Sequence, residues 1–366
     1  MNDNKTIKKL PVLLLIPLSA ALAQISSKRP DLVEKLYSSR IYKPIGRILS
    51  RATGIFPFSV AELIVLLVPA AFILYTIKVL AKSFSRSRIN FMPMAKYITN
   101  ILVIVSIALF CFLGIWGLNY YRMPFASIAG LDVQPTSVKE LESLCRALIE
   151  RANSLRLSVS IDAEGNMDIP GSRRDILNSC YKGYEVIAHT YPELAGSYGN
   201  PKPILLSGLM NYTGICGIYF PFTGEANVNV AIPESSLPST ASHEMAHQRG
   251  FSREDEANYI SYLACTAHPD VNFKYSGVLL ALTNSMNALY KNDRSIHAEL
   301  SEKYSEGVRH DLAEVNEFWQ QYEGPVERTS NRINNAYLKA NNQKDGVQSY
   351  GRMVDLLIAE HRQASE

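Results

Sequence analysis

Three long apolar stretches occupy the first third of the chain and set its hydropathy pattern. They cover about residues 10–25, 59–81 and 97–119. A helix that crosses the hydrocarbon core of a bilayer needs about 20 predominantly apolar residues. The pattern therefore predicts three transmembrane helices. The third carries aromatic residues suited to membrane interfaces at its ends: Tyr97, Trp116, Tyr120 and Tyr121.

The first apolar stretch allows two interpretations. It is short, and the run from Ala20 to Ala23 resembles a signal-peptide cleavage site. The following basic loop, residues 26–58, looks integral to the membrane part and is expected to hold an interfacial helix at about 40–52. We therefore favour an uncleaved first membrane helix.

Beyond residue 121 the pattern changes to that of a folded, mostly helical domain. Ser137 and Glu140 form a capping box that opens a helix at about 138–156, and a second helix is expected from Ser172 to about residue 190. After residue 258 the chain is expected to be helical nearly to its end, at about 252–267, 271–291, 295–322, 325–341 and 347–363.

A short stretch at 218–232 differs, because apolar and polar residues alternate there. Val228, Val230 and Ile232 share one face, and the turn signal at Thr223–Gly224 predicts a β-hairpin. Pro221 favours an edge strand. The expected fold class is mainly α, with a membrane region at 1–121 and a soluble domain with a small hairpin at 122–366.

Charge divides the chain at the same place. Residues 1–121 hold 15 Lys and Arg against 4 Asp and Glu, whereas residues 122–366 hold 22 against 30. The basic, apolar part suits a lipid bilayer with anionic headgroups. The acidic part argues against nucleic acid as a partner. The five cysteines form no CxxC pair, and we expect buried free thiols rather than disulfides.

The candidate chemistry lies in the pentapeptide from His243 to His247, which has the pattern HExxH. In a helix, residues four apart lie on one face, so both imidazoles can bind a single metal ion. Glu244 beside them can act as a general base, as in zinc hydrolases. Pro238 and Gly250 fit the start and the end of that helix.

A third ligand is available immediately afterwards, because Glu254 and Glu256 open the next expected helix. Spacing alone leaves both candidates open. The combination of HExxH with a following Glu and Asn resembles the gluzincin branch of the zincin metallopeptidases. That resemblance implies zinc bound by His243, His247 and Glu254, with Asn258 as the outer partner of Glu254. A metzincin would need a third His at position 253, where this chain has Arg253.

The longer string from His243 to Asn258 is similar to an uncharacterised bacterial membrane family that is known only as a domain of unknown function. The similarity extends to the C-terminal segment that contains Tyr350 and Arg352. We take Tyr350 as a further candidate catalytic residue, because a hydroxyl near the metal can stabilise an oxyanion. Core packing or a salt bridge is the competing role for both residues.

The sequence thus predicts a membrane-anchored zinc metallopeptidase that hydrolyses a peptide or protein substrate. The alternative is a non-catalytic membrane sensor or assembly protein with a structural or vestigial metal site. An intramembrane protease is disfavoured, because HExxH lies more than a hundred residues beyond the last apolar stretch. The basic N-terminal tail favours a bacterial inner-membrane topology in which the soluble domain is extracytoplasmic.

Overall fold

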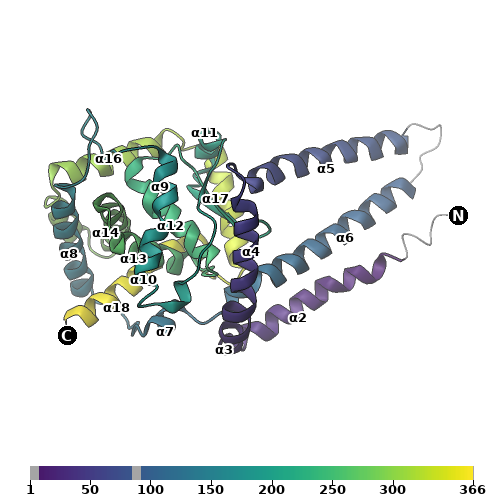
Figure 1. Cartoon of the computed structure of the whole chain (residues 1–366), viewed down its shortest axis with the longest axis horizontal. Coiled ribbons are helices and arrows are strands. Elements are labelled where there is room, and N and C mark those ends of the chain that lie inside the picture. Colours follow the sequence, from purple (N-terminus) through teal and green to yellow (C-terminus); the bar gives the residue numbers. More distant parts are fainter. Residues whose placement is uncertain (1–7, 85–91, 366) are drawn as a thin grey trace.

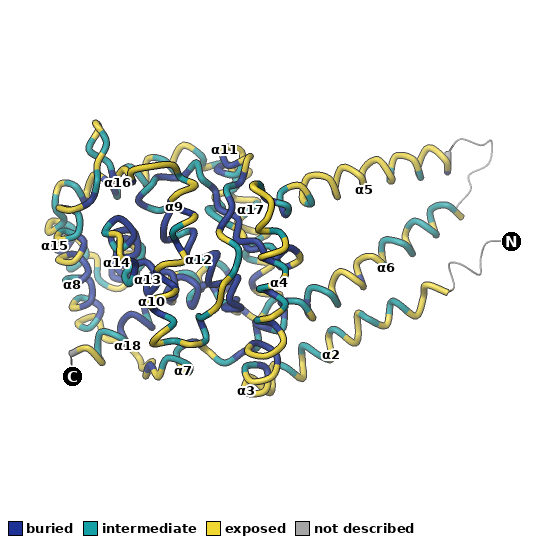
Figure 2. Tube along the Cα trace, in the orientation of Figure 1, coloured by how far each residue is buried: buried dark blue, intermediate teal, exposed yellow. Residues whose placement is uncertain are grey.

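The computed structural model describes residues 8–84 and 92–365. It is mainly helical, and a helical head carries three long apolar helices that project from one side (Figure 1). Figure 2 shows that these three helices are largely exposed along their length, whereas the head is well buried.

The three projecting helices are long and apolar enough to cross a membrane, as the hydropathy pattern predicted. The first comprises a 3-10 turn η1 (Leu10–Leu14) and α2 (Leu15–Ser27), and the others are α5 (Val60–Phe84) and α6 (Met92–Ile115). Helix α6 lies several residues N-terminal of its predicted bounds of 97–119. Pro93 is compatible with its first turn, and the chain leaves the α-helix before the 3-10 turn η3 (Gly117–Tyr121).

The loop between the first two apolar helices packs on the head. It forms α3 (Pro30–Leu32), a π-helical segment η2 (Val33–Tyr42) and α4 (Lys43–Gly54), so the expected helix at 40–52 is present. Tyr42 is fully buried, and Glu34 pairs with the buried Arg122 at 2.7 Å. The head therefore includes residues that the boundary at 121 assigned to the membrane region.

The core of the head is a packed set of helices. They are α8 (Val138–Arg156), α9 (Arg173–Ser179), α10 (Tyr181–Ile187), α12 (Leu237–Gln248), α13 (Glu254–Ala267), α14 (Val271–Asn292) and α18 (Met353–Ser365). The capping box of Ser137 and Glu140 is formed as predicted. All five cysteines are free, and Cys145, Cys180 and Cys265 are buried.

Two predicted helices are each divided into two. The helix expected after Ser172 breaks at Cys180 into α9 and α10. The helix expected at 295–322 becomes α15 (Arg294–Ser301) and α16 (Glu306–Gln320), because the hydroxyl of Ser305 caps a new N-terminus by accepting from Val308 N. Helix α17 (Pro325–Ala340) and the 3-10 segment η7 (Gly346–Arg352) precede α18.

A three-stranded sheet lies against α12. The predicted hairpin is formed by β2 (Gly217–Phe220) and β3 (Glu225–Val228), and β1 (Lys202–Pro203) pairs in parallel with β3. The order β1-β3-β2 makes β2 an edge strand. Strand β3 ends at Val228 rather than continuing to residue 232, and the Asn229 side chain donates to Asn211 Oδ1 at 2.7 Å.

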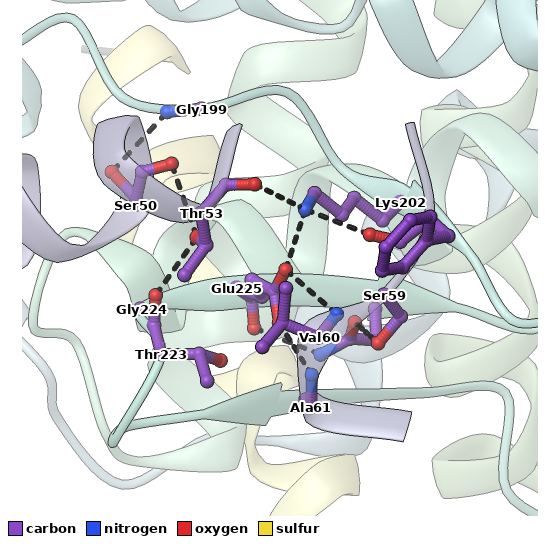
Figure 3. Close-up of polar contacts among 12 residues, drawn as sticks. Ser50, Thr53, Ser59, Val60, Ala61, Gly199, Lys202, Thr223, Gly224 and Glu225 are labelled. Carbon is purple, nitrogen blue, oxygen red and sulfur yellow. Dashed lines mark hydrogen bonds and ion pairs between the residues drawn. The ribbon is translucent and has the colours of Figure 1, made fainter. Parts of the chain in front are cut away.

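A buried ion pair joins this sheet to the membrane helix α5 (Figure 3). Lys202 Nζ lies 2.5 Å from Glu225 Oε1, and it also donates to the carbonyls of Thr53 and Phe58. The Glu225 carboxylate accepts from Val60 N and Ala61 N, the first backbone amides of α5. Glu225 therefore caps the helix N-terminus, where negative charge is favourable.

Candidate metal centre

Helix α12 presents the two histidines as the motif predicted. It begins at Leu237 with Pro238 in its first turn, and the chain turns at Gly250, whose φ is +86°. A side chain at Gly250 would also clash, because a Cβ there would lie 2.7 Å from Tyr42 Cε1. His243 and His247 are one helical turn apart, and their ring centroids lie 4.7 Å from each other.

Helix α13 brings the third donor. Glu254, its first residue, places Oε2 3.1 Å from His243 Nε2 and 3.4 Å from His247 Nε2. The three donor atoms all lie within 4.8 Å of one another. Zinc bonds of about 2.0–2.1 Å in a tetrahedron give ligand–ligand separations of about 3.3 Å, so the spacing fits one zinc ion.

Hydrogen bonds fix both imidazoles in the tautomer that metal binding requires. His243 Nδ1 lies 2.7 Å from Asn258 Oδ1, and His247 Nδ1 lies 2.7 Å from the carbonyl of Phe251. Both partners are acceptors, and Asn258 is oriented because its Nδ2 donates to the carbonyl of Tyr350. In neutral imidazoles the proton therefore sits on Nδ1, and the Nε2 lone pairs point toward Glu254.

The resemblance to gluzincins implied that Asn258 supports Glu254, but the structure places Asn258 on His243. Glu254 is held instead by the C-terminal part of the chain, since its backbone N–H donates to Gln343 Oε1 at 3.2 Å. Asn258 thus contacts a member of the candidate donor group, although a different one from that expected.

The electrostatics of the site favour a bound cation. Burial opposes the charged form of Glu254, yet the neighbouring imidazoles hold the pKa of its carboxyl well below the ordinary value. Burial also acts to lower the pKa of His247, but Glu254 and Glu244 raise it to about 9. Without a metal, the site holds a proton between imidazole and carboxylate. A divalent cation would replace that proton.

Glu244 lies beside this group in a tight, buried setting. It is only 4 % exposed, burial raises the pKa of its carboxyl, and its Oε2 has no hydrogen-bond partner. The strand β2 makes room for it, because a Cβ on Gly217 would lie 2.6 Å from Glu244 Oε1. A buried carboxylate with a raised pKa and a free oxygen is suited to accept and return a proton.

Glu256, the alternative third ligand, faces away from the histidines. Its Oε1 accepts from Arg253 at 2.6 Å and from Phe125 N at 2.8 Å. Arg249, which follows α12, is buried, and its guanidinium stacks on the ring of Tyr184 at 3.7 Å.

The C-terminal segment contributes Tyr350 to the site. Its ring stacks on His243 with centroids 6.2 Å apart, and burial, together with the nearby carboxylate of Glu254, raises the pKa of its hydroxyl. Arg352 is exposed and pairs with Asp345 and Asp355, so it does not reach the site. Tyr350 is thus a hydroxyl donor in contact with a candidate ligand.

The remaining histidines lie elsewhere among the described residues. His268 is buried and stacks on Phe273 with centroids 3.8 Å apart. Its ring also contacts the carbonyl of Ser179 at 3.1 Å. The others do not join the candidate donor group: His189, His297, His310 and His361.

Sequence reasoning missed the aromatic residues that support α12 from the membrane side. Trp116 Nε1 donates to the carbonyl of His247 at 3.2 Å, and Tyr42 donates to the carbonyl of Gln248 at 2.9 Å. Tyr219 packs on Trp116, and its hydroxyl lies 3.1 Å from that of Tyr42. Trp116 had been interpreted as a bilayer anchor, and nothing in its local sequence indicates a contact 131 residues away.

These features define a class of protein: a helical head on apolar helices, with an HExxH helix and a glutamate from the next helix forming one donor group. The chain belongs to the family described as "Protein of unknown function (DUF3810)", whose model matches residues 37–358. Searches of curated proteins and of solved structures found no significant match.

Proposed function

We propose that this chain is a membrane-anchored, zinc-dependent metallopeptidase of the inner membrane of a bacterium, with a gluzincin-like site in a zincin-like head. The observation that carries the proposal is the convergence of His243 Nε2, His247 Nε2 and Glu254 Oε2 at separations suited to one tetrahedral ion. The donor types and their hydrogen-bonded tautomers support zinc rather than an all-oxygen cation such as Mg²⁺.

Each residue has a distinct role in this proposal. Bound zinc would supply Lewis acidity and make a water molecule acidic enough to act as the nucleophile near neutral pH. Glu244 accepts the proton through its free Oε2 and then donates it to the leaving amine. The hydroxyl of Tyr350 is the donor that stabilises negative charge on the attacked carbonyl oxygen.

The ligand count favours an enzyme over a structural metal site. Structural zinc sites are usually closed by four protein ligands, whereas catalytic sites use three and leave one position open. Among residues 8–84 and 92–365, only three His, Cys, Asp or Glu side chains come together here. The open position is the one that a hydrolase needs.

Metal analysis of the full-length protein tests the proposal directly. The protein is purified in detergent, stripped with a chelator and titrated with Zn²⁺. We expect one zinc per chain, and we expect hydrolysis of a random peptide library to appear only in the zinc-loaded form. A chain that binds no zinc, or hydrolysis that persists in chelator, would contradict the proposal.

Removing the amide that orients His243 should weaken zinc binding. Asn258→Ala deletes the acceptor for His243 Nδ1–H, so the ring loses its fixed tautomer. We expect the zinc dissociation constant to rise by about 10–100-fold. Competition with a chromophoric chelator measures this change. Unchanged affinity would show that the 2.7 Å contact does not orient the ligand.

Adding one methyl group at Gly217 should displace the general base. The new Cβ in Gly217→Ala would lie 2.6 Å from Glu244 Oε1 and 2.7 Å from its Cγ. We expect kcat/KM for peptide hydrolysis to fall by about 10²-fold with zinc content unchanged, because such misplacement is costly in catalysis. Gly208→Ala is the matched control, since a Cβ there meets nothing within 4 Å.

A further inference from the structure

Helix α17 exposes an apolar stripe that the fold of the head leaves uncovered. Val326, Ile333 and Tyr337 are seven and four residues apart and therefore share one face. Their exposed fractions are 56 %, 67 % and 43 %. The face that packs on the head is a different one, where Leu338 is buried and α17 lies against η7.

A basic row lies on the polar side of α17, away from the apolar stripe. Arg328, Arg332 and Lys339 are four and seven residues apart, and all three are exposed. None of them forms an ion pair with a residue in the described part of the chain. This row stands out because residues 122–366 carry 22 Lys and Arg against 30 Asp and Glu. An apolar stripe combined with Lys and Arg on the polar face is typical of helices that lie in the headgroup region of a bilayer.

Contacts connect both ends of α17 to the membrane helices. At its C-terminal end, Tyr337 Oη lies 3.1 Å from Tyr120 Oη, five residues beyond the end of α6. At its N-terminal end, α17 packs on the 3-10 turn η5 (Asn211–Thr213), which directly follows α11 (Ser207–Met210). The helix therefore spans from the head end of α6 toward α11.

The residues that precede α11 are bound to the first turn of α5. The Glu62 carboxylate accepts from Leu205 N and Leu206 N, both at 2.9 Å. Leu205 and Leu209 are 73 % and 65 % exposed, so this end of the surface is also apolar. Figure 1 shows α11 and α17 on the side of the head from which the apolar helices project.

We propose that this face of the head rests on the lipid bilayer, with α17 lying in the headgroup region. The occupant of the stripe is anionic lipid rather than a protein, because the surface is continuous with two membrane helices and carries a basic row. The candidate metal ligands lie close behind it, because α17 packs on η7, whose Tyr350 stacks on His243.

This placement names a substrate class, which rests on the proposed peptidase function. Trp116, the residue after α6, donates to the carbonyl of the metal-binding His247, so the site lies at the membrane surface. A polypeptide anchored in the same bilayer is held at high local concentration there, whereas a free peptide must reach the space between head and lipid. The substrates are therefore membrane-anchored polypeptides cut close to their anchor.

Spin-label accessibility tests the membrane contact without any enzyme assay. The full-length protein, with Cys111→Ser and Cys216→Ser, carries Ile333→Cys and is placed in nanodiscs that contain anionic phosphatidylglycerol. We expect the label at position 333 to be accessible to oxygen, which is concentrated in lipid, and protected from a water-soluble nickel chelate. A label at Leu67→Cys in α5 is the lipid-side reference and should behave in the same way. Glu302→Cys is the aqueous control, because this exposed residue directly follows α15, which lies on the far side of the head from the apolar helices (Figure 2).

Two results of this measurement would overturn the membrane contact. One is nickel accessibility at position 333 equal to that at position 302, which would place α17 in water. The other is protection from both reagents, which would show that a second copy or another protein covers the stripe.

A peptide assay tests the substrate class. A random peptide library is offered to the zinc-loaded protein in nanodiscs, either free or with a palmitoyl anchor. We expect kcat/KM to be higher by about tenfold or more for the anchored form, because anchoring raises its effective concentration. The double variant Val326→Asp/Ile333→Asp should lose this preference while it cleaves free peptides as before.

The outcomes separate the two proposals. Equal cleavage of anchored and free peptides would overturn the substrate class and leave the peptidase intact. No cleavage of either form by the zinc-loaded protein would overturn the peptidase function and the substrate class together. The spin-label result would still decide the membrane contact.

Discussion

Glu244→Gln is expected to lower kcat/KM for peptide hydrolysis by about 10³-fold, within the range for loss of a general acid–base residue. The amide cannot accept the proton, although it has nearly the same size as the carboxylate. Glu244 is not one of the three donors, so the variant should bind zinc as tightly as the unaltered protein. Its buried side chain should keep its place beneath Gly217.

A matched change on the next helix provides the control. Glu256→Gln removes an equally buried carboxylate that lies on Arg253 and Phe125 N rather than near the histidines. We expect this variant to bind one zinc per chain and to keep the kcat/KM of the unaltered protein. Full activity in Glu244→Gln would remove Glu244 from its proposed role, and loss of zinc in Glu256→Gln would reopen the choice of third ligand.

Lys202→Met is expected to lower the free energy of unfolding by about 3–5 kcal/mol, the usual cost of leaving one buried charge without its partner. Glu225 is 2 % exposed, and no other cation lies within 4.0 Å of its carboxylate in the described part of the chain. The amides of Val60 and Ala61 would still donate to it, but they carry no net charge. Denaturant unfolding of the full-length protein in detergent measures the loss.

Neutralising the partner separates the buried charge from the packing of the side chain. The double variant Lys202→Met/Glu225→Gln leaves no unpaired ion, so we expect it to recover a large part of the lost stability. A cost below about 1 kcal/mol for Lys202→Met alone would mean that water reaches Glu225 and that the pair in Figure 3 is effectively a surface pair.

The parts of the fold that the sequence predicted best depend on local signals. The three apolar helices and the capping boxes follow from hydropathy and from residues within one turn. The arrangement of His243, His247 and Glu254 required only two consecutive helices and one Gly between them. These elements are specified by residues close together in the chain, so spacing and residue type were sufficient for them, except that the choice of Glu254 over Glu256 came from the resemblance to gluzincins.

Other contacts could not be predicted, because they join segments far apart in sequence. Nothing around Tyr42 indicates that its hydroxyl binds the carbonyl of Gln248, and nothing around Lys202 indicates a partner on β3. The partner of Asn258 differs from the expected one for a related reason. Helical spacing puts it one turn from Glu254, but its amide oxygen contacts His243 on the preceding helix.

The aromatic support beneath α12 has a practical consequence for anyone who wishes to isolate the head. A protein shortened to begin at residue 122 would lose Trp116 and Tyr42, and Arg122 would lose its partner Glu34. The backbone carbonyls of His247 and Gln248 would then face solvent or an empty space. The half that carries the candidate donor group is thus not a detachable module, and the intact chain is the material on which its chemistry has to be measured.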